Sequence, residues 1–184
     1  MSIERLTVSE WRASAHAQRR LDLGGTPEQA LAVREICARV ASEGDAALLE
    51  LGARFDGWQP APGESLGVPQ EEVARAIDLL TAEQQSALRL AAGRIRRFHE
   101  AERFEPLQAV GPLELRTRPV ERAGVYAPGG RASYPSTVLM TAIPARVAGV
   151  GTVVLATPPA RDGTVAPAVL AAAHLAGVDT VYRV

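Results

Sequence analysis

The chain contains no lysine, and arginine alone accounts for the 20 positions counted as Lys or Arg. A Schiff-base amine and the phosphate-binding residue of a P-loop are both lysines, so neither chemistry is available to this sequence. Cysteine occurs once, at Cys37, and no disulfide can form within the chain. A lone thiol favours a reducing compartment, and we expect a cytoplasmic protein.

An excess of positive charge and a long apolar run are also missing. With 20 basic and 21 acidic residues the net charge is −1, which is too little positive charge for a nucleic-acid partner. The most apolar segment, residues 165–178, is shorter than the roughly 20 residues that a membrane-spanning helix requires. The opening residues MSIERLTVSEW lack the basic head and apolar core of a signal peptide. We therefore expect a soluble protein without nucleic-acid or membrane partners.

Residues 1–112 predict a mainly helical region. Thr26 and Gln29 have the spacing of a capping box, and the helix that they begin should end near Gly44. We expect Asp45 to cap the following helix. Its inward side chains should be Leu48, Leu51 and Phe55.

A second capping box, formed by Thr81 and Gln84, begins a long helix with two different faces. One face, which is mainly apolar, carries Leu88, Ala91, Ala92, Ile95, Phe98 and Glu102. Arginines dominate the other face, which suits either a phosphate site or a solvated surface. We favour the solvated surface for these residues, which are Arg89, Arg94, Arg96 and Arg97.

Residues 113–184 alternate between strands and helices. The expected strands cover residues 113–117, 124–126, 152–156 and 180–182, and the expected helices cover 137–147 and 165–176. The run Val153-Val154-Leu155 is apolar on both faces, which is typical of a parallel strand covered by helices. The fold class is therefore α/β: a helical N-terminal arm (1–112) followed by an incomplete Rossmann-like parallel βαβαβ unit (113–184).

The loop after the strand at 124–126 is the candidate ligand site, because ligands of open α/β sheets bind beyond the carboxyl ends of the strands. Gly129 and Gly130 allow positive φ angles and a close approach of a ligand to the backbone. Tyr126 offers a ring for stacking and a hydroxyl group. We expect Ser136 or Thr137 to cap the next helix, whose N-terminal amides favour anions. A tight turn with a packed tyrosine is the alternative interpretation.

Motifs for metal binding and catalysis are absent from the sequence. His16, His99 and His174 are far apart, and neither H-x-x-x-H nor C-x-x-C occurs. The glycines around Gly129 do not form a G-x-G-x-x-G fingerprint. We therefore assign no catalytic residue and no metal ligand.

Two long segments carry a family resemblance. Residues 124–159 read GVYAPGGRASYPSTVLMTAIPARVAGVGTVVLATPP, and residues 33–57 read VREICARVASEGDAALLELGARFDG. With the pairs Phe98-His99 and Asp162-Gly163, these segments resemble the histidinol dehydrogenase family. The resemblance covers nearly the whole chain from about residue 33.

The resemblance implies a cytoplasmic, homodimeric enzyme that binds zinc, uses NAD and oxidises L-histidinol to L-histidine in two hydride transfers. It implies that Tyr126 contacts NAD and that Gly129 and Gly130 shape the same crevice. Members of the family are more than twice as long. The zinc ligands and the glutamate–histidine pair that handles protons would lie beyond Val184.

We therefore expect the chain to be the N-terminal portion of an NAD-dependent histidinol dehydrogenase that is inactive alone. The alternative is a non-catalytic interaction or nucleotide-binding module that associates with a separate C-terminal half.

Overall fold

The computed structural model describes residues 7–13, 25–102, 107–129 and 133–184. The chain divides into two compact units, Met1–Leu48 and Leu49–Val184, and each unit is described by itself. This division reflects compactness, and the boundary drawn at residue 112 from the sequence stays a prediction. Among the described residues, no helix is long and apolar enough to cross a membrane.

The first unit contains α1 (Val8–Ala13), α3 (Pro27–Glu43) and the beginning of α4 (Asp45–Phe55). The capping box of α3 is confirmed, because the amide of Gln29 donates to Thr26 Oγ1 at 3.3 Å and the Thr26 amide donates to Gln29 Oε1 at 2.9 Å. The expectation that Asp45 is a cap is wrong: Asp45 is the first residue of α4. No residue of α3 is buried.

The second unit contains the rest of α4 and eleven further elements, two of which form a separate hairpin. In chain order they are β1 (Gly67–Val68), α5 (Gln70–Arg75), the 3-10 helix η1 (Ala76–Leu79), α6 (Ala82–Ala101), β2 (Leu107–Val110), β3 (Leu113–Arg116), β4 (Arg122–Tyr126), α7 (Pro135–Val147), β5 (Thr152–Thr157), α8 (Pro167–Ala176) and β6 (Thr180–Arg183).

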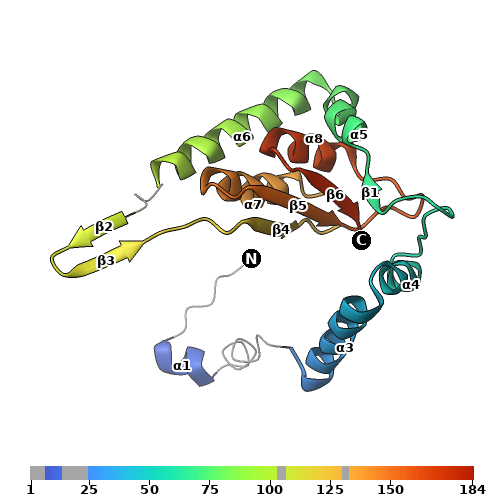
Figure 1. The fold of residues 1–184 in the computed structure, drawn as a ribbon, viewed down its shortest axis with the longest axis horizontal. Helices are drawn as coiled ribbons and strands as arrows, with labels where there is room; N and C mark the ends of the chain where they lie inside the picture. Colours follow the sequence, from blue (N-terminus) through green and yellow to red (C-terminus); the bar gives the residue numbers. More distant parts are fainter. Residues whose placement is uncertain (1–6, 14–24, 103–106, 130–132) are drawn as a thin grey trace. The chain divides into compact units, whose positions relative to one another are not determined.

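The main sheet has the strand order β1-β6-β5-β4 (Figure 1). Strands β4, β5 and β6 run parallel, which confirms the expected βαβαβ unit, and β1 is antiparallel to β6. The sequence did not predict β1, a strand of only two residues. Because the sheet grows in one direction, right-handed crossovers place α7 and α8 on the same face. Helix α6 lies against both of them.

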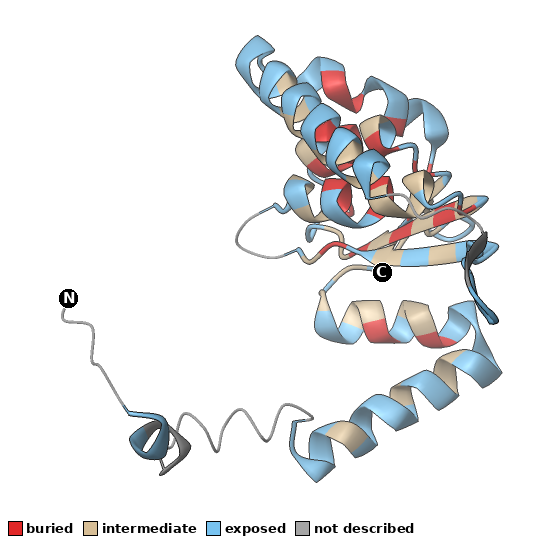
Figure 2. Ribbon diagram, turned by 90° about the vertical axis from the view of Figure 1, so that its left-hand side faces the viewer, coloured by how far each residue is buried: buried red, intermediate tan, exposed pale blue. Residues whose placement is uncertain are grey.

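The hydrophobic core lies between these helices and one face of the sheet (Figure 2). Val153 and Leu155 of β5 point into it together with Val181 of β6, and all three are fully buried. The next residues along the strands point to the other face, where Val154 is half-buried and Tyr182 is exposed. The structure thus covers one face of the sheet much more completely than the other.

Two aromatic side chains on apolar helix faces are exposed, and for Phe55 this corrects the prediction that it points inward. Phe98 of α6 is 61% exposed, although Leu88, Ala91 and Ile95 on the same helix pack against the core. Phe55, at the end of α4, is also exposed. Helical periodicity identifies an apolar face, but it does not show how far along the helix the neighbouring elements extend.

The alternation of apolar and polar residues in 113–117 predicts a half-exposed strand. Strand β3 is confirmed within this segment, but all four of its residues are exposed. Among the described strands its partner is β2, in an antiparallel hairpin that includes the pair Val110 and Leu113. Leu113 and Leu115 are therefore exposed. A two-stranded hairpin has few neighbours to bury its side chains.

An ion pair between Arg146 and Asp179 organises the end of the sheet where the parallel strands begin. Arg146 Nη1 donates to the carbonyl oxygen of Gly151 at 2.8 Å, and its Nε donates to that of Gly177 at 2.8 Å. Asp179 Oδ2 accepts the amide of Val153 at 2.7 Å. The hydrogen bond from the Val153 amide has the larger effect and that from Arg146 the smaller, and together they hold the pKa of Asp179 below its ordinary value.

We expect Asp179→Asn to flatten the acid dependence of stability. Because the folded-state pKa of Asp179 is lowered, its stabilisation is present above the unfolded-state value of about 4 and is lost as the pH falls through the folded value. Melting temperatures measured between pH 7 and pH 3 should therefore fall less steeply in the variant. Asp78→Asn, which changes an exposed carboxylate of η1, should keep the wild-type profile. Equal profiles for Asp179→Asn and the wild type would contradict the assignment.

Candidate functional site

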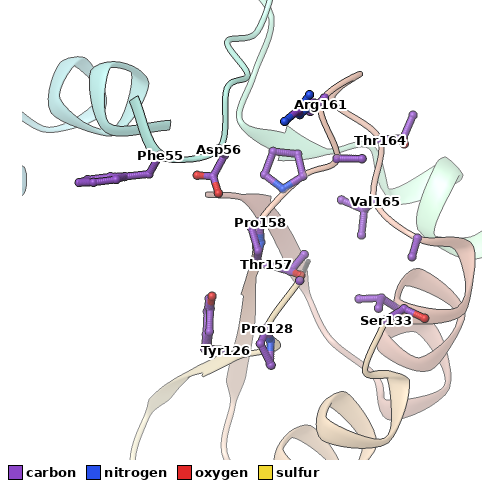
Figure 3. A pocket seen from close by; sticks show the side chains of 15 residues that line it. Phe55, Asp56, Tyr126, Pro128, Ser133, Thr157, Pro158, Arg161, Thr164 and Val165 are labelled. Atoms are coloured by element: carbon purple, nitrogen blue, oxygen red, sulfur yellow. The ribbon is translucent and has the colours of Figure 1, made fainter. Parts of the chain in front are cut away.

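A cleft of about 880 Å³ lies at the carboxyl ends of β4 and β5 (Figure 3). Its volume is in the range of small-molecule sites. The loops after the two strands form most of its walls, and the end of α4 and the start of α8 complete it. The described residues that line it are Phe55, Asp56, Tyr126, Pro128, Gly129, Ser133, Thr157, Pro158, Pro159, Ala160, Arg161, Thr164, Val165, Ala166 and Val169.

Tyr126, the last residue of β4, is a site residue predicted from the sequence, and it lines the cleft. Its side chain is 58% exposed and stands at one side of the cleft. In the sheet it is paired with Ala156, whose other neighbour is Tyr182 of β6. The small side chain of Ala156 leaves the ring of Tyr126 free on the incompletely covered face of the sheet. The alternative of a packed core tyrosine is therefore wrong.

The two predicted glycines have different outcomes. Gly129 lines the cleft, and its φ is not positive. A Cβ atom there would lie 2.6 Å from Cγ of Pro158, so close packing between the two loops is what requires glycine. Gly130 lies outside the described residues. A role for either glycine in cofactor binding stays a prediction.

Two helices begin at the cleft. Helix α7 starts at Pro135 after Ser133 of the cleft wall, and α8 starts at Pro167 directly after Ala166. The prediction that Ser136 or Thr137 caps α7 is wrong, because both residues lie inside the helix. Neither helix has a side-chain cap. The positive ends of both helix dipoles therefore remain available to an anion.

Sequence reasoning missed Asp56 and Arg161, the two charged residues among the described residues of the cleft wall. Asp56 follows α4, where the pair Asp56-Gly57 indicated only the end of a helix. Arg161 belongs to the loop after β5, where Pro158 and Pro159 indicated only the end of a strand. The two residues are far apart in the sequence, and only the folded structure shows that both line the same cleft.

A largely buried arginine side chain fixes the loop that carries Arg161. The side chain of Arg183, at the end of β6, is 13% exposed, and its guanidinium lies 4.9 Å from the ring centroid of Trp58. Its Nη2 donates to Glu64 Oε1 at 2.8 Å, and its Nη1 donates to the Gly163 carbonyl at 3.2 Å. We call this group of four residues the Arg183 clamp. The clamp connects the segment after α4, the end of β6 and the loop after β5.

Carboxylates around the clamp are stabilised in their charged form. The amide of Ala61, and then Arg183, lower the pKa of Glu64. Asp162 accepts the hydroxyl of Thr164 at 2.7 Å and its amide at 3.0 Å, and these two bonds lower the pKa of Asp162. The loop around Asp162 is therefore fixed both internally and through Gly163.

The described residues offer no metal centre, because no three His, Cys, Asp or Glu side chains lie together in a group that would hold an ion. His99 Nδ1 lies 2.9 Å from Glu102 Oε2, and its ring makes an edge contact with the ring of Phe98. These residues do not fit the zinc that the family resemblance implies. The expectation that zinc ligands lie beyond Val184 stays a prediction.

The fold and the cleft define an α/β protein with a ligand site beyond the carboxyl ends of its parallel strands. The family model for histidinol dehydrogenase matches residues 24–184. The chain belongs to the histidinol dehydrogenase family, as the sequence resemblance indicated.

Named relatives share a large part of this sequence. A histidinol dehydrogenase from Parasynechococcus marenigrum is 49% identical over 153 residues, which cover 81% of this chain and 34% of that protein. One from Methanosarcina barkeri is 44% identical, with 93% and 40% covered. The crystal structure of histidinol dehydrogenase from Elizabethkingia anophelis matches with a TM-score of 0.79 and 29% identity, over 97% of this chain and 41% of that one. The chain spans 34–41% of the length of these proteins.

Gly163→Ala should loosen the Arg183 clamp. Gly163 has a φ of +82°, and a Cβ atom there would lie 2.8 Å from Cε2 of Trp58. Gly63→Ala is the matched control, because its φ is +84° and an added Cβ meets nothing within 4 Å. In urea unfolding, Gly163→Ala should lower the free energy of unfolding by at least about 1 kcal/mol more than Gly63→Ala does. Equal losses would show that the contact with Trp58 does not constrain this loop.

Proposed function

We propose that this chain supplies one wall of the NAD site of a cytoplasmic histidinol dehydrogenase, an enzyme that oxidises L-histidinol to L-histidine. The observation that carries the proposal is the cleft at the ends of β4 and β5, which lies within the segment matched by the family model. Ligands of open α/β sheets bind beyond the carboxyl ends of the strands, where this cleft lies. The alternative, a non-catalytic interaction module that associates with a separate C-terminal half, has no comparable feature in its support among the described residues.

The described residues of the cleft fit a dinucleotide. The exposed ring of Tyr126 provides a flat surface for stacking. The starts of α7 and α8 have no side-chain cap, and the positive ends of their helix dipoles suit the negative charge of a pyrophosphate. Bound NAD supplies the hydride acceptor for the oxidation of an alcohol. In this proposal the residues of the chain bind and orient the cofactor.

Proton transfer is assigned to other residues. The described residues that line the cleft include no histidine, cysteine or lysine, and Asp56 is their only carboxylate. A dehydrogenase needs a group that removes the hydroxyl proton of its substrate. We infer that this proton-accepting group and the zinc ligands belong to the longer protein that the family describes. We also infer that two copies of that longer protein form a homodimer.

Tyr126→Ala should weaken NAD binding about tenfold, since it removes an aromatic surface from the cleft. Isothermal titration calorimetry of the 184-residue chain would measure the affinity. Tyr182→Ala is the matched control, because Tyr182 is an exposed tyrosine two strands away on the same sheet face and does not line the cleft. The proposal requires the two variants to differ, and it fails if the wild type does not bind NAD.

The 184-residue chain alone should not oxidise L-histidinol, since the cleft lacks a histidine, cysteine or lysine among its described lining residues. Absorbance at the wavelength of NADH, followed with L-histidinol and NAD, would measure the reaction. A full-length relative such as the Methanosarcina barkeri protein serves as the positive control. NADH formation by the purified chain above the rate without L-histidinol would refute the division of roles.

A further inference from the structure

The carboxylate of Asp56 faces the cleft and has no bonded partner among the described residues. Asp56 is partly buried, and its side chain forms no hydrogen bond or ion pair with any residue that the structure describes. Arg161 lines the same cleft and forms no ion pair with Asp56. A carboxylate that faces a cleft without a partner is free to accept hydrogen bonds from a ligand.

The residue before Asp56 suggests what kind of ligand group lies there. The ring of Phe55 is exposed and lines the same side of the cleft (Figure 3). An aromatic ring beside a carboxylate matches a nucleoside, because the base stacks on the ring and the two ribose hydroxyls donate to the carboxylate. Tyr126 approaches from the same side, with its hydroxyl directed toward Asp56. This side of the cleft therefore suits the adenosine half of a dinucleotide.

One positive charge lies beside Phe55, because the guanidinium of Arg54 is 5.0 Å from the centroid of its ring. The other cationic groups lie further along the cleft. Arg161 occupies the loop after β5, which the Arg183 clamp holds in place through Gly163. The starts of α7 and α8 lie near Ser133 and Val165, which Figure 3 shows on the side away from Phe55. A dinucleotide with its adenosine beside Asp56 has its phosphates directed toward these groups.

We propose that Asp56 binds the free 2′,3′-diol of the adenosine ribose and thereby selects NAD over NADP. The inference rests on the proposed NAD-binding role of the cleft. A 2′-phosphate carries a charge of about −1.5 to −2 at neutral pH and has no proton to donate to Asp56 at the position of the 2′-hydroxyl. It would face the carboxylate directly, and like charges at this range disfavour binding.

The test compares ligands that differ only in the 2′-phosphate. Calorimetric titrations of the 184-residue chain use NAD against NADP, and AMP against adenosine 2′,5′-bisphosphate, which isolates the adenosine half. The wild type should bind the unphosphorylated member of each pair at least about tenfold more tightly. Asp56→Asn should reduce this preference to about threefold or less, by weakening NAD binding and strengthening NADP binding. Asp56→Ser provides a second variant with a smaller side chain.

Asp162→Asn is the matched control. Its carboxylate is close in sequence to Arg161, but it is occupied by Thr164 and does not line the cleft, so the preference should stay at the wild-type value. If NAD binds and both Asp56 variants keep the wild-type preference, the assignment of Asp56 is overturned and the proposed NAD site stands. If the wild type binds neither NAD nor AMP, the proposed function fails and the inference fails with it. Melting curves of each variant identify any loss of folding.

Discussion

The handedness of the connections between parallel strands is the constraint on which the second unit depends. Strands β4, β5 and β6 lie side by side in chain order, so each crossover has the same sense and both connecting helices must lie on one face. The loops that lead into α7 and α8 then leave the sheet at the same edge. The cleft forms between these loops, and two helix N-termini begin beside it. The position of the site is thus a result of topology, and the side chains determine only its chemistry.

Arginine provides the polar connections at both ends of this sheet. At one end Arg146 bonds to backbone carbonyl groups and to Asp179, and at the other end Arg183 bonds to a carbonyl group, to Glu64 and to the face of Trp58. A guanidinium has five donors in a planar fork, so it can join several segments at once and still stack on a ring. A lysine ammonium could not make this set of contacts. In a chain without lysine, the positive charges that remain are the ones best suited to connecting loops.

The sequence predicted features that depend on neighbouring residues and missed features that depend on distant ones. Both capping boxes, at Thr26 and Thr81, follow from side chains three residues apart, and both are present. The alternation in residues 122–183 likewise follows from local apolar patterns. Strand β1 is too short for any pattern and exists because it pairs with β6. The exposure of Phe98 depends on where other elements end. Tyr126 was found through its strand, whereas Asp56 and Arg161 come from separate segments that carry no shared signal.

Strand β6 connects the edge of the sheet to the ligand site. It pairs with β1, and the amide of Arg183 donates to the carbonyl of Leu66 at 2.9 Å while its side chain holds Gly163 beside the cleft. Local opening in proteins occurs in cooperative groups of contacts. Separation of β6 from its neighbours would release β1, the segment after α4 and the loop with Arg161 in a single event. Amide protons in these three distant segments would then exchange with solvent at one common rate, and a ligand that protects one of them would protect them all.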